Sequence, residues 1–488
     1  MAKIGKPPAL SGTGTDPGSI LAAMSHSSRW IALTGLLIAE AMNLLDATIV
    51  QVAAPVMHTA LAGPDSDIQW FSAAYTLPLA MVLITGGRLG DICGRRRIFR
   101  VGVAGFVLAS VLCALSTSAG MLIATRAVQG AAAGLIIPQT FGLIRGMFDG
   151  AELPKALGTI GPVMGLAAVC GPIIGGLLTH ADLFGSSWRS VFLVNVPLGV
   201  AVLLLARLLP EDRAPQAGRL DLPGTALAMF GAGLVMYPLI QADWTAVTWA
   251  SLACGALVLV SFAGQQRANS RRGRDSLIAV SLFGSRGFVA ALVCLALFFA
   301  VLNGVLLVVV LRLQLGLHAS VLTTSLTLLP WSVGMGVSSM LAGRYLYPRY
   351  GANIVFAGLG LLLAGIAGAA VMGESWPLLG ALGVAGLGIG LFTTPLFTLA
   401  LHNVRPHETG SAAGLLNAVQ SLGSTFGIAL LGTVFFGAGA PHALLVAGGL
   451  VVLTVIGAAV MVNGARRRSG DDQSEVGDSL DSESVLSD

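Results

Sequence analysis

Fourteen apolar segments, joined by mostly short polar connections, constrain this chain more than any other feature of its sequence. Each is about 20 residues long, the length that an α-helix needs to cross the hydrocarbon core of a bilayer. Of the 488 residues, 55% are hydrophobic and only 10% are charged, too few polar side chains to cover a water-soluble globule. The segments lie near residues 30–57, 68–87, 98–117, 120–146, 153–179, 189–209, 222–241, 247–264, 287–311, 320–342, 353–373, 376–401, 410–436 and 441–463. The sequence therefore predicts an all-α polytopic membrane protein.

Basic residues gather in alternate connections. Arg88 to Arg100 follow the second segment and Arg267 to Arg274 follow the eighth, whereas the intervening connections contain few basic residues, with Arg189 and Arg312 as the main exceptions. Lysine and arginine stay on the cytoplasmic side of a membrane during insertion. We therefore expect a multi-pass protein of the plasma membrane with both termini in the cytoplasm.

The segments divide as six, two and six, and secondary transporters are often built from two related halves. The polar N-terminus lacks the apolar stretch of a signal peptide, and the acidic, serine-rich C-terminus has too few apolar residues to form a core. The expected organisation is a disordered N-terminus (1–28), an N-terminal six-helix bundle (29–210), two inserted helices (220–265), a C-terminal six-helix bundle (286–464) and a disordered acidic tail (465–488).

Other classes of protein find little support in the sequence. The five cysteines are scattered without the spacing of metal ligands, and no segment combines basic and aromatic residues as nucleic-acid-binding surfaces do. No histidine is placed with an acidic residue or a serine inside a segment as an intramembrane enzyme would require. We expect neither an enzyme nor a metal, cofactor or nucleic-acid site.

Charged residues inside the apolar segments are few. The first segment contains Glu40 and Asp46, and the fourth contains Arg126, with Gln129 on the same helix face. Each charge costs roughly 2.5–3.5 kcal/mol at the middle of the bilayer on insertion scales, so its presence needs a reason. Asp46 and Arg126 could form a structural ion pair, or Asp46, assisted by Arg126 and with Glu40 as a second candidate, could bind and release a proton.

Neutral polar or aromatic residues also interrupt the segments. These side chains could join helices by hydrogen bonds, or they could form the wall of a substrate cavity. Asn417 and Gln420 share one helix face because three positions separate them. The candidate cavity residues are Gln129, Asn303, Trp331, Asn417 and Gln420.

Two glycine-rich stretches stand out. In the fifth segment, small residues recur at steps of three and four and leave a smooth seam against which another helix can pack closely; the glycines and proline concerned are Gly161, Gly165, Gly171, Pro172, Gly175 and Gly176. The connection after the second segment could be a basic turn that only sets topology, or a conformational latch in which Asp91 accepts bonds from arginines; its residues are Gly87, Asp91, Gly94, Arg95 and Arg96.

Five segments together resemble the major facilitator superfamily, and more narrowly its fourteen-helix drug/proton antiporter family of the EmrB/QacA type. Residues 45–55 (LDATIVQVAAP) are similar to the family's LDxTIVNVALP, with Gln51 and Ala54 as departures, and residues 188–199 (WRSVFLVNVPLG) are similar to WRWIFLINVPIG. Residues 87–97, 126–130 and 165–176 resemble its latch, fourth-helix and antiporter motifs.

The resemblance implies a major facilitator fold of two six-helix bundles plus two inserted helices. It implies a proton-coupled exporter of drugs or secondary metabolites that works by alternating access, with Arg126 implicated in proton transfer. The expected partners are protons, the lipid bilayer and a small amphipathic or cationic substrate. Proton symport or facilitated uptake of a small molecule on the same fold is the alternative.

Overall fold

The computed structural model describes residues 26–485 except 183–184, 212–219, 242, 244, 273–279, 372–375, 403 and 405–408. Nearly all of this described chain is helical, and none of it lies in a β-strand. Fourteen helical segments of the described chain are long and apolar enough to cross a membrane. The predicted fold class is therefore confirmed.

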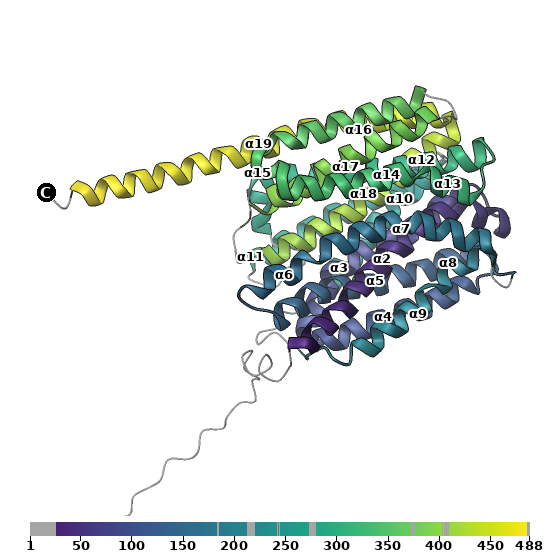
Figure 1. The fold of residues 1–488 in the computed structure, drawn as a ribbon, viewed down its shortest axis with the longest axis horizontal. Coiled ribbons are helices and arrows are strands. Elements are labelled where there is room, and N and C mark those ends of the chain that lie inside the picture. Colours follow the sequence, from purple (N-terminus) through teal and green to yellow (C-terminus); the bar gives the residue numbers. More distant parts are fainter. Residues whose placement is uncertain are drawn as a thin grey trace, which may run out of the picture.

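The first six crossings pack around a core of their own, whose buried side chains run from Ala32 to Leu209 (Figure 1, purple to blue). Two of these crossings are interrupted: α6 with α7 forms the fifth, and the short η2 and α8 with α9 form the sixth. The bounds are α2 (His26–Leu61), α3 (Ser66–Cys93), α4 (Arg95–Ala114), α5 (Ala119–Met147), α6 (Glu152–Gly158), α7 (Ile160–Ala181), η2 (Ser187–Arg189), α8 (Ser190–Leu193) and α9 (Asn195–Leu205).

The last six crossings surround the largest core cluster of the described residues, in which Val52 is the one buried side chain from the first half. The inserted pair is α10 (Leu222–Gln241) and α11 (Ala246–Arg271), and the short η3 (Val280–Gly284) leads into the second half. Its helices are α12 (Arg286–Leu311), η4 (Arg312–Gly316), α13 (Val321–Thr327), α14 (Leu329–Leu341), η5 (Ala342–Leu346), α15 (Tyr347–Tyr350), α16 (Asn353–Val371), α17 (Trp376–His402), α18 (Thr409–Ala438) and α19 (Ala440–Val485).

Glycines bring α3 and α5 into backbone contact. A Cβ atom at Gly134 would lie 2.9 Å from the carbonyl oxygen of Leu79, and one at Gly130 would collide with the carbonyl oxygen of Tyr75. In lipid, such small residues let helices approach closely enough for extensive van der Waals contact. The close approach also places the polar face of α5 directly against α3.

The two halves touch toward the end of the molecule at which α2 ends and α3 begins. Gln51 donates to Asn303 (3.2 Å), and Gln314 donates to the carbonyl oxygen of Val52 (2.8 Å). Thr76 of α3 and Thr425 of α18 share a hydrogen bond of 2.7 Å. Polar contacts therefore tie α2 and α3 to α12, η4 and α18.

The inserted hairpin lies along the line where the halves meet. Thr225 near the start of α10 bonds to Thr85 of α3 (2.7 Å), and Thr433 of α18 donates to the carbonyl oxygen of Leu239 near the end of α10. Asp221 fastens the base of the hairpin, because its carboxylate accepts the backbone N–H of Gly224 at the start of α10 (2.9 Å) as well as an amide of α11. The hairpin thus contacts both halves.

The connection between the second and third crossings is shorter than the expected turn over Gly87–Arg97. Helix α3 continues to Cys93 and α4 begins at Arg95, so Gly94 alone reverses the chain. Its φ of 100° is in the region that favours glycine.

Helix α19 continues beyond the last crossing to Val485 and extends away from the bundle (Figure 1, yellow). The disorder expected of the acidic tail at residues 465–488 stays a prediction. A helix that is already formed lengthens without a new nucleation cost, so an extension needs no core of its own.

Candidate functional site

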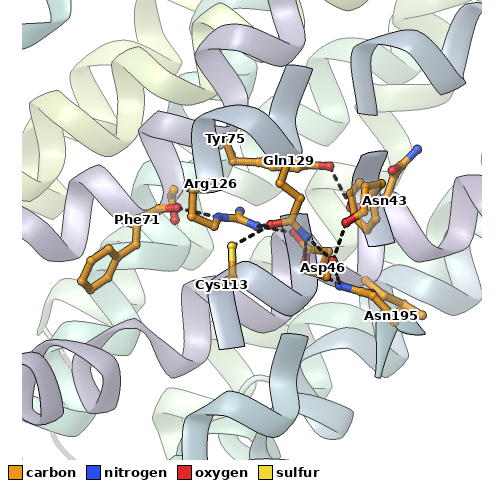
Figure 2. Close-up of polar contacts among 12 residues, drawn as sticks. Asn43, Asp46, Phe71, Tyr75, Cys113, Arg126, Gln129 and Asn195 are labelled. Atoms are coloured by element: carbon orange, nitrogen blue, oxygen red, sulfur yellow. Dashed lines mark hydrogen bonds and ion pairs between the residues drawn. The ribbon is translucent and has the colours of Figure 1, made fainter. Parts of the chain in front are cut away.

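Asp46 and Arg126 form a fully buried ion pair inside the first half. Arg126 donates from Nη1 to Asp46 Oδ2 at 2.5 Å. The Arg126 side chain is 1% exposed and the Asp46 side chain is 0% exposed. The pair connects α2 to α5, as Figure 2 shows. The structure thus brings together the two charged residues that the sequence singled out at these helices.

The other carboxylate oxygen, Asp46 Oδ1, accepts two amides. Gln129 donates to it at 2.8 Å and Asn195 donates to it at 2.8 Å, and both amides are completely buried. Each amide also donates to the Ser110 hydroxyl, at 2.9 and 3.3 Å respectively. Asp46 therefore has donors from α5 and α9, Gln129 and Asn195 (Figure 2). The Ser110 hydroxyl connects those donors to α4.

Arg126 is held from several sides. Its Nε donates to the carbonyl oxygen of Phe71 at 3.0 Å, and its Nη1 also donates to Gln129 Oε1 at 2.7 Å. The guanidinium carbon lies 4.3 Å from the ring centroid of Tyr75, a distance at which the ring's negative face attracts a cation. Planarity and several donors suit arginine, not lysine, to this arrangement.

Asn195 and Ser110 were not among the residues predicted from the sequence. A weak signal for Asn195 existed, because it lies inside the segment 188–199 that resembles a family motif. Gln129, which was expected to line a substrate cavity, lies inside this network instead of beside the polar residues of the second half. We call Asp46, Ser110, Arg126, Gln129 and Asn195 the buried network.

Glu40 and Asn43 form a second polar group, one helical turn apart on α2. Both side chains are buried, at 4% and 5% exposure. Glu40 faces Thr140 of α5, yet within the described part of the chain its Oε1 has no hydrogen-bond partner, and neither does the amide nitrogen or oxygen of Asn43. Buried polar atoms without partners are costly, so these three atoms are suited to water or to a polar group of a ligand.

The expected cavity residues of the second half are spread apart. Asn303 lies between the halves, where it accepts from Gln51 (3.2 Å) and donates to Ser424 (2.9 Å). Trp331 is 4% exposed within the core of the second half, while Asn417 donates to the carbonyl oxygen of Ala413 on its own helix at 2.9 Å. Gln420, one turn further along α18, is half-buried. Asn303 thus contacts the first half directly.

The glycine seam of α7 is only half covered. Cβ atoms at Gly171 and Gly176 would collide with Thr48 and Ser325, whereas no atom of the described residues lies within 4 Å of a Cβ atom at Gly161 or Gly165. Gly175 and Pro172 are buried with the covered part. The expectation of close packing therefore holds for the second part of the seam, against α2 and α13, and not for its first part in this conformation.

The residues of the expected latch join helices within the first half. Arg95 donates to Asp91 Oδ1 from Nε (3.1 Å) and Nη2 (2.8 Å), which bridges the turn at Gly94. Arg96 donates to the carbonyl oxygen of Arg207, after α9, at 3.1 Å. A Cβ atom at Gly90 would collide with the Gln139 side chain of α5, and Gly87 lies beside α5 as well. These contacts connect α3 and α4 to α5 and α9.

Comparison with known proteins gives a consistent picture. The profile of the Major Facilitator Superfamily matches residues 36–428 and 288–475. A probable actinorhodin transporter of Streptomyces coelicolor is 44% identical over 437 residues, covering 87% of this chain and 75% of the relative. The puromycin resistance protein pur8 of Streptomyces alboniger is 36% identical, covering 85% and 83%, and the cephamycin export protein CmcT of Amycolatopsis lactamdurans is 34% identical, covering 83% and 85%.

Among solved structures, a peptide transporter POT in complex with sulfate superposes with a TM-score of 0.67 at 15% identity, covering 93% of this chain and 99% of that chain. The human organic anion transporter MFSD10 superposes with a TM-score of 0.59 at 17% identity, covering 88% and 99%. At these identities the likeness concerns the fold alone.

Proposed function

Because the chain belongs to the major facilitator superfamily, we propose that it exports small organic molecules of the antibiotic class in exchange for protons. The buried network carries the proposal: it places a carboxylate, the group that can take up a proton, among donors from several helices. Relatives named for actinorhodin transport, puromycin resistance and cephamycin export support the direction of transport and the class of cargo. The cargo is moved unchanged, and the proposal needs no cofactor.

Proton binding at Asp46 rearranges the network by simple chemistry. Both carboxylate oxygens face donors: Arg126 at Oδ2, and Gln129 with Asn195 at Oδ1. A protonated carboxyl group carries an O–H that needs an acceptor, so at least one of these contacts must break. Because the donors belong to α5 and α9, loss of a contact alters how those helices are held against α2.

The membrane supplies the driving force. One proton that enters the cell gains about 2.3 kcal/mol per 100 mV of membrane potential, in addition to the contribution of the pH gradient. We propose that this energy drives a cycle between inward and outward openings, with Asp91 and Arg95 as a latch that holds α3 to α4 in one of them.

We place both termini in the cytoplasm and the protein in the plasma membrane. The alternation of basic connections supports this orientation. The contacts of Gln51 and Gly176 with the second half, and of Gln314 with Val52 of the first half, then lie at the outer end. The uncovered glycines Gly161 and Gly165 lie toward the cytoplasm. In this orientation the conformation described above is closed to the outside.

We propose that cargo binds where Glu40 and Asn43 leave polar atoms without partners. Asn303, Asn417 and Gln420 are candidates for the opposite wall. A buried carboxylate with an unused oxygen favours an amphipathic cargo that carries a positive charge or several hydrogen-bond donors.

The test is proton-coupled efflux measured with Asp46→Asn in inverted membrane vesicles. Asparagine keeps the shape of the side chain but cannot take up a proton, so we expect substrate to release no protons from energised vesicles that contain the variant. Asp65→Asn, at an exposed position between α2 and α3, is the matched control and should retain the wild-type signal. Coupling that persists in Asp46→Asn would reject Asp46 as the proton site, and inward flux in intact cells would favour the uptake alternative.

A further inference from the structure

A basic groove lies outside the buried network, between the start of α4 and the end of α9. Its volume is about 620 Å³. Among the residues that the structure describes, four arginines line it, Arg96, Arg97, Arg100 and Arg207, and Glu211 is the one acid. These five side chains have a net charge of +3, from four positive charges and one negative charge. The groove therefore attracts anions.

The remaining lining of the groove is apolar and accessible. Val101 is 54% exposed on α4, and Val200 and Leu204 are 47% and 54% exposed on α9. The apolar strip continues along α4 beyond the groove to Leu108, which is 63% exposed. Since α4 and α9 both cross the membrane, this strip is suited to contact with hydrocarbon chains.

The arginines are placed where their own helix disfavours them. Arg95, Arg96 and Arg97 occupy the first turn of α4, which has no acidic residue and no side-chain cap. The first turn of a helix carries partial positive charge, so cations there are destabilising and an anion is stabilising. Arg95 forms an ion pair with Asp91. No such ion pair joins an acidic residue of the described chain to the arginines that line the groove.

The lining arginines are indeed unpaired with any acid of the described chain. Arg96 donates from Nη2 to the carbonyl oxygen of Arg207 at 3.1 Å, while its Nε is buried and has no acceptor among the described residues. A buried N–H without an acceptor is costly, and a phosphate oxygen is a strong acceptor for a guanidinium group.

We infer that this groove binds the headgroup of an anionic phospholipid, with its phosphate among the four arginines and an acyl chain along Val101 and Leu204. Charge selects the anionic lipid over a zwitterionic one, because the groove's excess positive charge exceeds what a neutral headgroup can balance. The apolar wall selects a lipid over a soluble phosphate. The inference is independent of the transported cargo.

Native mass spectrometry of the purified full-length protein tests the inference, with phosphatidylglycerol and phosphatidylethanolamine added at equal concentration. We expect the wild type to retain phosphatidylglycerol preferentially, and the triple variant Arg97→Gln, Arg100→Gln, Arg207→Gln to bind it at least tenfold more weakly. The single variant Arg100→Gln, at an exposed position, should show a smaller loss in the same direction even where the triple variant folds poorly.

The matched control also removes three positive charges, but from exposed positions outside the groove at the same end of the molecule. Its substitutions are Arg145→Gln, Arg344→Gln and Arg349→Gln. It should retain phosphatidylglycerol as the wild type does. An equal loss in the control, or equal retention of both lipids by the wild type, would overturn the inference. Displacement of phosphatidylglycerol by millimolar inorganic phosphate would assign the groove to a soluble anion instead.

Discussion

At the scale of single residues, the two oxygens of Asp46 have different partners. Oδ2 faces the cation Arg126, whereas Oδ1 faces the neutral amides of Gln129 and Asn195. Loss of one charge from the pair leaves the other charge buried with only dipoles around it, and an uncompensated buried charge strongly destabilises the folded protein.

This asymmetry predicts the outcome of a double-mutant cycle. Arg126→Leu alone leaves the Asp46 carboxylate buried without a cation and should lower the free energy of unfolding by about 3–5 kcal/mol. The double variant Arg126→Leu, Asp46→Asn removes both charges and should recover most of that loss. Denaturant titration in mixed micelles measures both, and a double variant no more stable than Arg126→Leu would contradict the prediction.

The charged members of the network were predictable because charge is rare inside apolar segments, so Asp46 and Arg126 stand out in the sequence. Asn195 and Ser110 were not, since small polar residues occur at many positions in membrane helices and most bond to their own helix. The contact of Asn195 with Asp46, and those of Ser110 with Gln129 and Asn195, depend on how α4 and α9 pack, which no local pattern encodes. The unpartnered atoms of Asn43 were hidden for the same reason.

At the scale of elements, hydropathy predicted all fourteen crossings, because a bilayer imposes one length on every helix that spans it. The same signal cannot locate a turn of one residue, so the helical extensions on either side of Gly94 were missed. The seam on α7 was visible as a pattern of small residues. The sequence could not tell which part of it is covered, because both conformations of a transporter share one sequence.

The covered and uncovered parts of the seam should respond differently to the same substitution. Gly176→Val would push into Ser325, whose Cβ would lie 2.8 Å from the added Cβ, and into Leu322, so overpacking should destabilise the protein by about 1–3 kcal/mol. Gly165→Val introduces the same β-branched side chain into the same helix, and therefore the same restriction of its χ1 angle. Its Cβ would enter open space, so the melting temperature of Gly165→Val should be higher than that of Gly176→Val. Equal melting temperatures would contradict this difference.

At the scale of the whole molecule, the halves meet at one end and alternating access requires that end to separate. A disulfide between Gly176→Cys and Ser325→Cys should therefore arrest transport, and a reducing agent should restore it. A shift of about 1 Å suffices for the disulfide, since bonded cysteines keep their Cβ atoms roughly 3.5–4.5 Å apart and the positions are closer than that.

Efflux assays before and after reduction measure the effect, with each single cysteine variant as a control for the substitutions themselves. Full transport by a protein that is quantitatively crosslinked would show that this end does not open during the cycle.

The donors to Asp46 come from α5 and α9, both in the first half of the chain, and the second half supplies none of them in the part of the chain that the structure describes. On our proposal that Asp46 binds the proton, the residues of proton coupling are encoded by one contiguous stretch of gene. Recombination near the inserted hairpin would exchange the second half without disturbing it. On our proposal, such an exchange would replace the cavity wall formed by Asn303, Asn417 and Gln420, while Glu40, Asn43 and the buried network stay unchanged.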